Sequence, residues 1–377
     1  MPNLYKLKFI SFFFFPFWIL FSNEPAMVSS ERIEIDHKVI VKHPGEEVPV
    51  ETILTEIQNK DSTTIGYAME VESVICLDEV CKEIPVRLFW NDIGVYQKYV
   101  LAKDATLEKY EADLFEPEDY KKLHTVLANE NSPFKDVAIH QVLTAVEDDS
   151  VDAVAGATAL ELDEKDTVPG AALTCYTLWH WANGDIIKTI KKKTGESSTN
   201  QQLLEFLVND NKSYYPIALE ALVSRNHYAS EFIETVIERA ANHDDLIKAS
   251  IKYLEAAPLE VYTASLKKIF IASEKLQRIA VIRSLQYSKK ELPKDYLDSF
   301  SNEIGYLKSF QEVSVFLGLM EVKNPNSIQI NKALIALMEG DFLIARRVYW
   351  FLGEQSNLDD GQQKKLKTFS EAHSDKL

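Results

Sequence analysis

The chain has 377 residues, of which 46% are hydrophobic and 26% are charged, and its formal net charge at pH 7 is −17. An acidic surface repels the phosphate backbones of nucleic acids and the anionic headgroups of lipids, so neither is expected as a binding partner. The length exceeds what one hydrophobic core usually serves, which predicts two domains.

Residues 1–26 have the pattern of a secretory signal peptide. Lys6 and Lys8 precede an apolar stretch over residues 9–21, and a short polar segment follows it. The stretch is too short to span a bilayer comfortably as a helix, which favours a signal peptide, and an uncleaved membrane tether through the same stretch is the alternative. Because residues 1–26 hold two Lys and one Glu, their removal leaves a net charge of −18. We therefore expect an exported protein of the periplasm or cell envelope.

Residues 27–190 mix strand and helix patterns, which predicts an α+β domain. Residues 31–41 alternate as a strand, and residues 66–76 and 80–88 form a predicted β-hairpin. A second turn between strands is expected over residues 89–96.

Two cysteines, Cys76 and Cys81, flank the turn of this hairpin. In an exported chain we expect them to form a disulfide, which closes a small loop and contributes about 2 kcal/mol on the chain-entropy estimate. The alternatives are a zinc pair, which needs two further ligands, and a thioredoxin-type redox pair, which has two intervening residues rather than four. The third cysteine, Cys175, lies in a predicted helix and is expected to be a small buried hydrophobe.

Two helices are predicted in the second half of this domain. The first covers residues 116–128, with Pro117 in its first turn and acidic residues near the positive end of its dipole. The second runs from residue 171 to about residue 188 and carries an aromatic run in which His180 lies between two tryptophans.

A short motif of small residues, Asp-Ala-Val-Ala-Gly-Ala-Thr, lies between these helices at residues 152–158. Its glycine and alanines allow a planar or phosphorylated ligand to approach the backbone, and its threonine offers a hydroxyl for hydrogen bonding or covalent attachment. Without a ligand, the same residues are expected to form a tight turn before an acidic loop.

The motif resembles the FMN-binding domain family, which includes the flavinylated subunits of ion-pumping quinone reductase and Rnf-type complexes. The family signature is roughly Asp-x-x-Ser/Thr-Gly-Ala-Thr, and Ala155 stands here where Ser or Thr is expected. The residues that match the signature are Asp152, Gly156, Ala157 and Thr158. The resemblance covers residues 90–185 at most and implies bound FMN, with its phosphate hydrogen-bonded or esterified to the final threonine.

Two interpretations of His180 follow. It stacks on or hydrogen-bonds to a flavin near Thr158, or it is a core residue of the aromatic helix. The eight histidines show no spacing typical of metal ligands, so no metal site is predicted, and no catalytic residue is assigned.

Residues 191–200 are charged and then rich in Ser and Thr, which predicts a linker. Beyond it, residues 201–358 have helical patterns that repeat. Four apolar helices each open with a small residue, at spacings of 31, 31 and 65 residues: Ala218, Ala249, Ala280 and Ala345. A partner helix is expected before each apolar helix, including one near residue 313, at residues 201–208, 231–240, 262–271, 295–304 and 331–338.

Paired helices with a period near 31 residues are typical of a HEAT-like α-solenoid, here of five pairs. A non-repetitive helical bundle is the alternative. Residues 359–377 are expected to be a polar C-terminal tail. The predicted fold is thus an α+β domain followed by an all-α HEAT-like solenoid.

Two functions are compatible with these patterns. The family resemblance implies an FMN-binding electron-transfer component of the cell envelope, with a protein partner docked on the solenoid. The alternative is a non-catalytic exported interaction or scaffold protein whose FMN-binding-like domain is degenerate.

Overall fold

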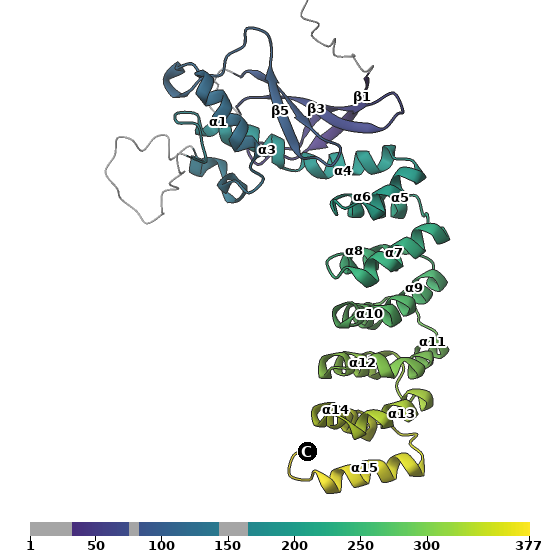
Figure 1. Cartoon of the computed structure of the whole chain (residues 1–377). Coiled ribbons are helices and arrows are strands. Elements are labelled where there is room, and N and C mark those ends of the chain that lie inside the picture. The colour runs from purple at the N-terminus through teal and green to yellow at the C-terminus, as the bar shows by residue number, and fades with distance from the viewer. Residues whose placement is uncertain (1–31, 75–82, 143–164) are drawn as a thin grey trace, which may run out of the picture.

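The computed structural model describes residues 32–74, 83–142 and 165–377. The predicted signal segment, the cysteines Cys76 and Cys81, and the motif over residues 152–158 lie outside the described residues. The described chain forms an antiparallel sheet with helices on one face, from which a long column of helices extends (Figure 1).

Five strands form the sheet in the order of the sequence, and each pairs with the next in antiparallel orientation. They are β1 (Ile33–Val41), β2 (Val50–Gln58), β3 (Thr64–Glu72), β4 (Pro85–Trp90) and β5 (Tyr96–Leu101). The predicted first strand and the pairing of β3 with β4 are confirmed. β2 was not predicted, and it places a buried glutamate, Glu56, inside the sheet.

Alternate residues of the strands face the helices and form the first apolar core. Leu54, Met69 and Leu88 lie side by side in the strand register on this face, and all three are buried. Three helices cover the face: α1 (Pro117–Ala128), α3 (Ala172–Asn183) and α4 (Ile186–Ser197). Short 3-10 turns, η1 (Tyr110–Ala112) and η2 (Pro133–Asp136), flank α1.

The predicted helix over residues 171–188 is in fact two helices, which meet at Gly184. The amide of Gly184 donates to the carbonyl of His180, and a Cβ atom at Gly184 would lie 2.3 Å from that oxygen. α3 therefore ends at a residue that has no side chain, and α4 starts two residues later.

The prediction of a linker over residues 191–200 is wrong. Most of this segment belongs to α4, because Ile186, Ile190 and Thr194 recur at helical spacing and are buried. The hydroxyl of Thr199 then accepts from the amide of Gln202 and starts the next helix directly.

Ten helical segments follow in two rows, and each coincides with one of the ten predicted helices. The first row contains α5 (Asn200–Val208), α7 (Ser230–Asn242), α9 (Leu259–Ala272), α11 (Lys294–Asp298) continued by η3 (Ser299–Tyr306), and α13 (Ile328–Leu334) continued by η4 (Ile335–Glu339). The second row contains α6 (Tyr214–Ser224), α8 (Ile247–Ala256), α10 (Lys275–Tyr287), α12 (Phe310–Lys323) and α14 (Phe342–Gly353).

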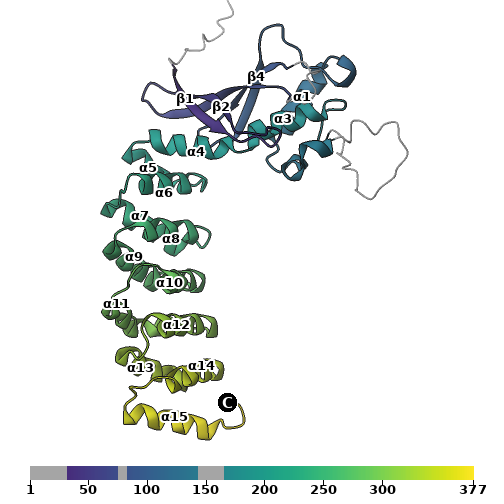
Figure 2. The same cartoon turned by 180° about the vertical axis from the view of Figure 1, so that it is seen from behind.

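The two rows lie next to each other along the whole column (Figure 2). In the second row α6 packs on α8, α8 on α10, α10 on α12, and α12 on α14. One apolar cluster runs through the column from Leu203 to Phe369, and a separate cluster under the sheet ends at Ile190. The chain therefore has two cores, with α4 between them.

The predicted polar tail over residues 359–377 is also mostly a helix, α15 (Asp360–Ala372). Asp359 and Gln362 form a capping box at its start, and Phe369 turns inward onto the column. In the part of the chain that the structure describes, no helix is both long and apolar enough to cross a membrane.

Candidate functional site

His180 lies inside the core between the sheet and α3. Its side chain is buried, and its ring centroid is 4.4 Å from that of Tyr176, 5.0 Å from that of Trp179 and 5.7 Å from that of His43. This enclosure by rings is the geometry of a core residue, which was one of the two interpretations of His180.

His43, which follows β1, is held in one tautomer by two hydrogen bonds. Its Nδ1 accepts from the amide of Gly45 at 3.0 Å, so its Nε2 carries the proton and donates to the carbonyl of Thr177 at 3.0 Å. Burial lowers the pKa of His43 to about 4, and burial also lowers the pKa of His180 to about 4. Both imidazoles are therefore neutral at pH 7.

The same side of α3 carries four buried polar atoms that have no hydrogen-bond partner among the described residues. They are Tyr176 Oη, Thr177 Oγ1, His180 Nε2 and Trp181 Nε1. An unpaired polar atom in a protein interior costs about 1–3 kcal/mol, so such atoms are uncommon and mark sites of ordered water or ligand. Four of them within two turns of one helix single out this region.

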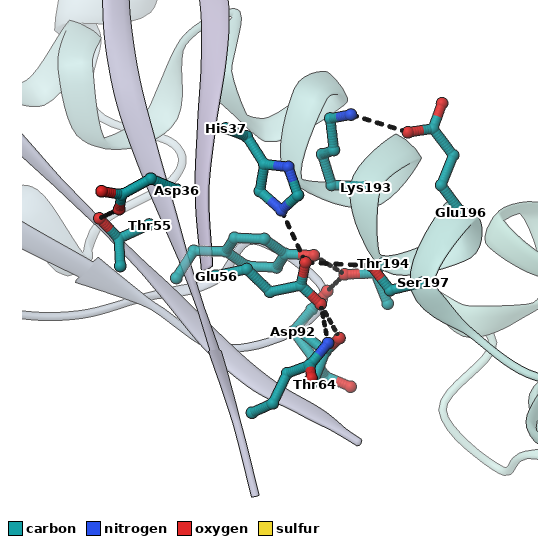
Figure 3. A network of polar contacts seen from close by, with 12 residues as sticks. Asp36, His37, Thr55, Glu56, Thr64, Asp92, Lys193, Thr194, Glu196 and Ser197 are labelled. Atoms are coloured by element: carbon teal, nitrogen blue, oxygen red, sulfur yellow. Dashed lines mark hydrogen bonds and ion pairs between the residues drawn. The ribbon is translucent and has the colours of Figure 1, made fainter. Parts of the chain in front are cut away.

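A second polar cluster joins the sheet to α4 around Glu56 (Figure 3). Its carboxylate accepts from His37 Nε2 at 2.7 Å and from Ser197 Oγ at 3.0 Å on one oxygen. The other oxygen accepts from Thr64 Oγ1 at 2.5 Å and from Gln58 Nε2 at 2.9 Å. Burial raises the pKa of Glu56, but the four donors outweigh burial and hold the pKa below its ordinary value.

A chain of hydroxyl groups continues this cluster toward the column. Tyr67 is hydrogen-bonded to Thr194 at 3.0 Å, and Thr194 donates to the carbonyl of Asp92 (Figure 3). The carboxylate of Asp92 in turn accepts from the hydroxyl of Tyr214 on α6 at 2.8 Å. Because four donors surround the carboxylate of Glu56 and a tyrosine of the column binds that of Asp92, this cluster is built as a structural joint between the sheet, α4 and the column.

An acidic pocket lies at the opposite end of β2, where β2 and β3 separate. The pairing between the two strands runs from Gln58 opposite Thr64 to Leu54 opposite Met69 and stops there. Beyond that point β2 stays paired with β1 as far as Val50, and β3 stays paired with β4 as far as Glu72. The resulting fork holds a pocket of about 410 Å³. Five glutamates line it, together with Trp181 and short apolar side chains: Glu46, Glu51, Glu70, Glu72 and Glu83.

No cluster of His, Cys, Asp and Glu suited to a metal ion occurs among the described residues. Comparison of the chain with known protein families, with curated proteins and with solved structures found no match.

Among the predicted site residues, only His180 lies in the described part of the chain, so the structure does not test whether it meets the motif over residues 152–158. The fork and the Glu56 cluster were not predicted. Recognising β2 would have found the Glu56 cluster, because the alternation of Leu54 and Glu56 places a carboxylate on the buried face of a strand.

Proposed function

We propose that this chain is an exported interaction protein whose helical column is a HEAT-like solenoid that docks a protein partner. The observation that carries the proposal is the regular stacking of the second-row helices from α6 to α14. Export rests on the signal-peptide pattern of residues 1–26.

Equivalent contacts recur between successive helix pairs and support a repeat. The ammonium group of Lys290 donates to the carbonyl of Ala257, the C-cap residue of α8, at 2.9 Å. Lys323 makes the equivalent bond, also at 2.9 Å, to the carbonyl of Ser288, the C-cap residue of α10. The partners are 33 and 35 residues apart. In the first row an ion pair between Lys268 and Glu234 has the same span, 34 residues. Contacts at one period between neighbouring units are expected of a solenoid.

Apolar side chains at equivalent positions of three stacked helices mark the docking surface. Leu276, Phe310 and Leu343 stand at the starts of α10, α12 and α14, and their exposed fractions are 60%, 46% and 48%. They are 34 and 33 residues apart. Aligned exposed apolar side chains are typical of a protein-binding surface.

Photo-crosslinking in an exporting host tests this proposal. A photoreactive residue placed at Phe310 or Leu343 should give one defined protein adduct, and the same residue at Glu238 in α7, exposed on the other row, should not. The double variant Phe310→Ser/Leu343→Ser should lose the partner while keeping its thermal transition. Identical adducts from all three positions would contradict a docking surface on the second row.

FMN binding is a second proposal, and it is carried by the motif from Asp152 to Thr158 alone. Intact mass and a visible spectrum of the exported protein test covalent attachment, and titration with FMN tests non-covalent binding. An FMN mass that Thr158→Ala removes would support a flavoprotein. An unmodified mass with no binding on titration would exclude it.

A further inference from the structure

We infer that the fork between β2 and β3 binds a basic side chain, lysine or arginine, presented by an extended segment of polypeptide. The inference goes beyond the proposed function, because the fork belongs to the sheet domain and is independent of docking on the column.

The charge around the fork is uncompensated. Of its five glutamates, only Glu51 has a cation within ion-pair distance among the described residues, Lys38 at 3.9 Å. Burial and then the neighbouring carboxylates of Glu83 and Glu70 raise the pKa of Glu72. Like charges gathered without a counterion repel one another, and a bound cation relieves that repulsion.

The acidic charge of the described chain is concentrated in the same domain. The described residues up to residue 200 contain 23 Asp and Glu against 16 Lys and Arg, a net charge of −7. Residues 201–377 contain 24 against 22, a net charge of −2. A basic ligand is therefore attracted to the sheet domain rather than to the column, and this attraction will weaken with added salt.

Trp181 supplies the observation that points to a ligand. It lines the pocket, only 6% of the residue is exposed, and its buried Nε1 donor has no partner in the part of the chain that the structure describes. An indole ring attracts ammonium and guanidinium groups through its π face. Its N–H is a donor only, so it is satisfied by an acceptor such as a peptide carbonyl.

Two features thus favour a polypeptide over a free polyamine. A polyamine carries cations but no carbonyl acceptor for Trp181. The separated strand segments, from Val50 to Ile53 and from Glu70 to Glu72, are also not paired with each other, and unpaired strand segments are where extended peptides add to a sheet.

Fluorescence anisotropy with the full-length protein tests the site. The probe is a labelled peptide of alternating lysine and glycine, with its Nε-acetylated form as the neutral control. We expect Glu70→Gln/Glu72→Gln to weaken binding by about tenfold or more, which corresponds to about 1.4 kcal/mol. Glu231→Gln/Glu238→Gln removes the same charge from exposed positions of α7 and should change binding by less than about twofold.

Competition by spermidine and the variant Trp181→Phe together distinguish a polypeptide ligand from a free polyamine. Trp181→Phe should weaken the peptide while leaving spermidine competition unchanged, because the variant keeps an aromatic ring but lacks the N–H donor. If spermidine binds as tightly as the peptide and Trp181→Phe affects neither, the polypeptide assignment is overturned. Equal losses from the two glutamate pairs, or no binding of the lysine peptide, would overturn the site itself.

Discussion

At the scale of single residues, Glu56 shows how a buried charge is tolerated. Four donors surround its carboxylate, from β1, β2, β3 and α4. We predict that Glu56→Gln lowers the free energy of unfolding by about 1–3 kcal/mol, because the amide nitrogen faces donors and leaves them unpaired. Urea denaturation at pH 7 measures the change.

Glu51→Gln is the matched control for this prediction. Glu51 lies in the same strand, is exposed, and has only a weak ion pair with Lys38. Its substitution should change the unfolding free energy by less than about 0.5 kcal/mol. Equal effects of the two substitutions would show that the donors around Glu56 contribute little.

The two buried histidines predict a loss of stability in mild acid. In the unfolded chain an imidazole has a pKa of about 6.5, whereas burial lowers the pKa of His43 and of His180 to about 4 in the fold. As the pH falls from 6.5 to 4, the unfolded state takes up protons that the native state excludes. The unfolding free energy therefore falls across this window, by about 3 kcal/mol for each imidazole.

His180→Phe tests this prediction, because phenylalanine keeps a ring among the aromatic neighbours and cannot titrate. Urea unfolding between pH 7.5 and pH 4 should show about half of the wild-type decline in this variant. Tyr176→Phe, in the same aromatic cluster, should leave the decline unchanged, because burial raises the pKa of the Tyr176 phenol further away from this pH window. A wild-type decline that survives His180→Phe in full would contradict the assignment.

The surroundings of His180 also show which contacts a local sequence pattern does not predict. The aromatic run around His180 predicts a helix, and its core placement was one of two open interpretations. Its ring partner His43 is 137 residues away, in a loop after β1, and no local pattern connects the two. Contacts of this kind arise from strand order, which local periodicity does not specify.

At the scale of elements, a buried ion pair joins α10 to α12. Arg278 Nε donates to Glu312 at 2.8 Å, both side chains are buried, and a second guanidinium nitrogen bonds to the carbonyl of Ser273. Burial raises the pKa of Glu312, but hydrogen bonds from Ser309 and Arg278 outweigh it and keep the pKa below its ordinary value. The carboxylate is therefore charged at pH 7.

We predict that Arg278→Met lowers the free energy of unfolding by about 3–5 kcal/mol, since it leaves the charge of Glu312 buried without a counterion. The double variant Arg278→Met/Glu312→Gln should recover most of this loss, because a neutral glutamine keeps the capping bond to Ser309 and leaves no buried charge. Thermal and urea unfolding of both variants measure the difference. A double variant as unstable as the single one would mean that the pair has a role beyond mutual neutralisation.

Helices were easier to predict than the segments that join them. The ten helices of the column follow from apolar residues at helical spacing, as in α7 with Phe232, Val236 and Ala240. α4 was mistaken for a linker because three consecutive lysines hide the spacing of Ile186, Ile190 and Thr194. β2 was missed because its buried face carries Glu56, a residue that is depleted in strands.

At the scale of the whole molecule, α4 couples two cores that have no apolar residue in common. Arg225 on the column donates to the carbonyls of Gly195 and Ser198 at the end of α4. Gly195 lets α6 approach closely, because a Cβ there would lie 3.1 Å from that of Ala221. The joint around Glu56 and these contacts together hold the column against the sheet through α4.

A column in which each helix contacts only its neighbours should lose stability locally when one end is weakened. Asp359 caps α15 by accepting from the amide of Gln362 at 2.8 Å, and Thr199 caps α5 in the same way at the other end. We predict that Asp359→Ala, which costs about 1 kcal/mol of helix stability, increases hydrogen exchange in α15 and α14 while α5 and α6 keep their protection. Thr199→Ala should produce the reverse pattern. Exchange that rises uniformly in both variants would show that the column unfolds as a single unit, and a partner bound at α10 to α14 would then sense changes at the sheet.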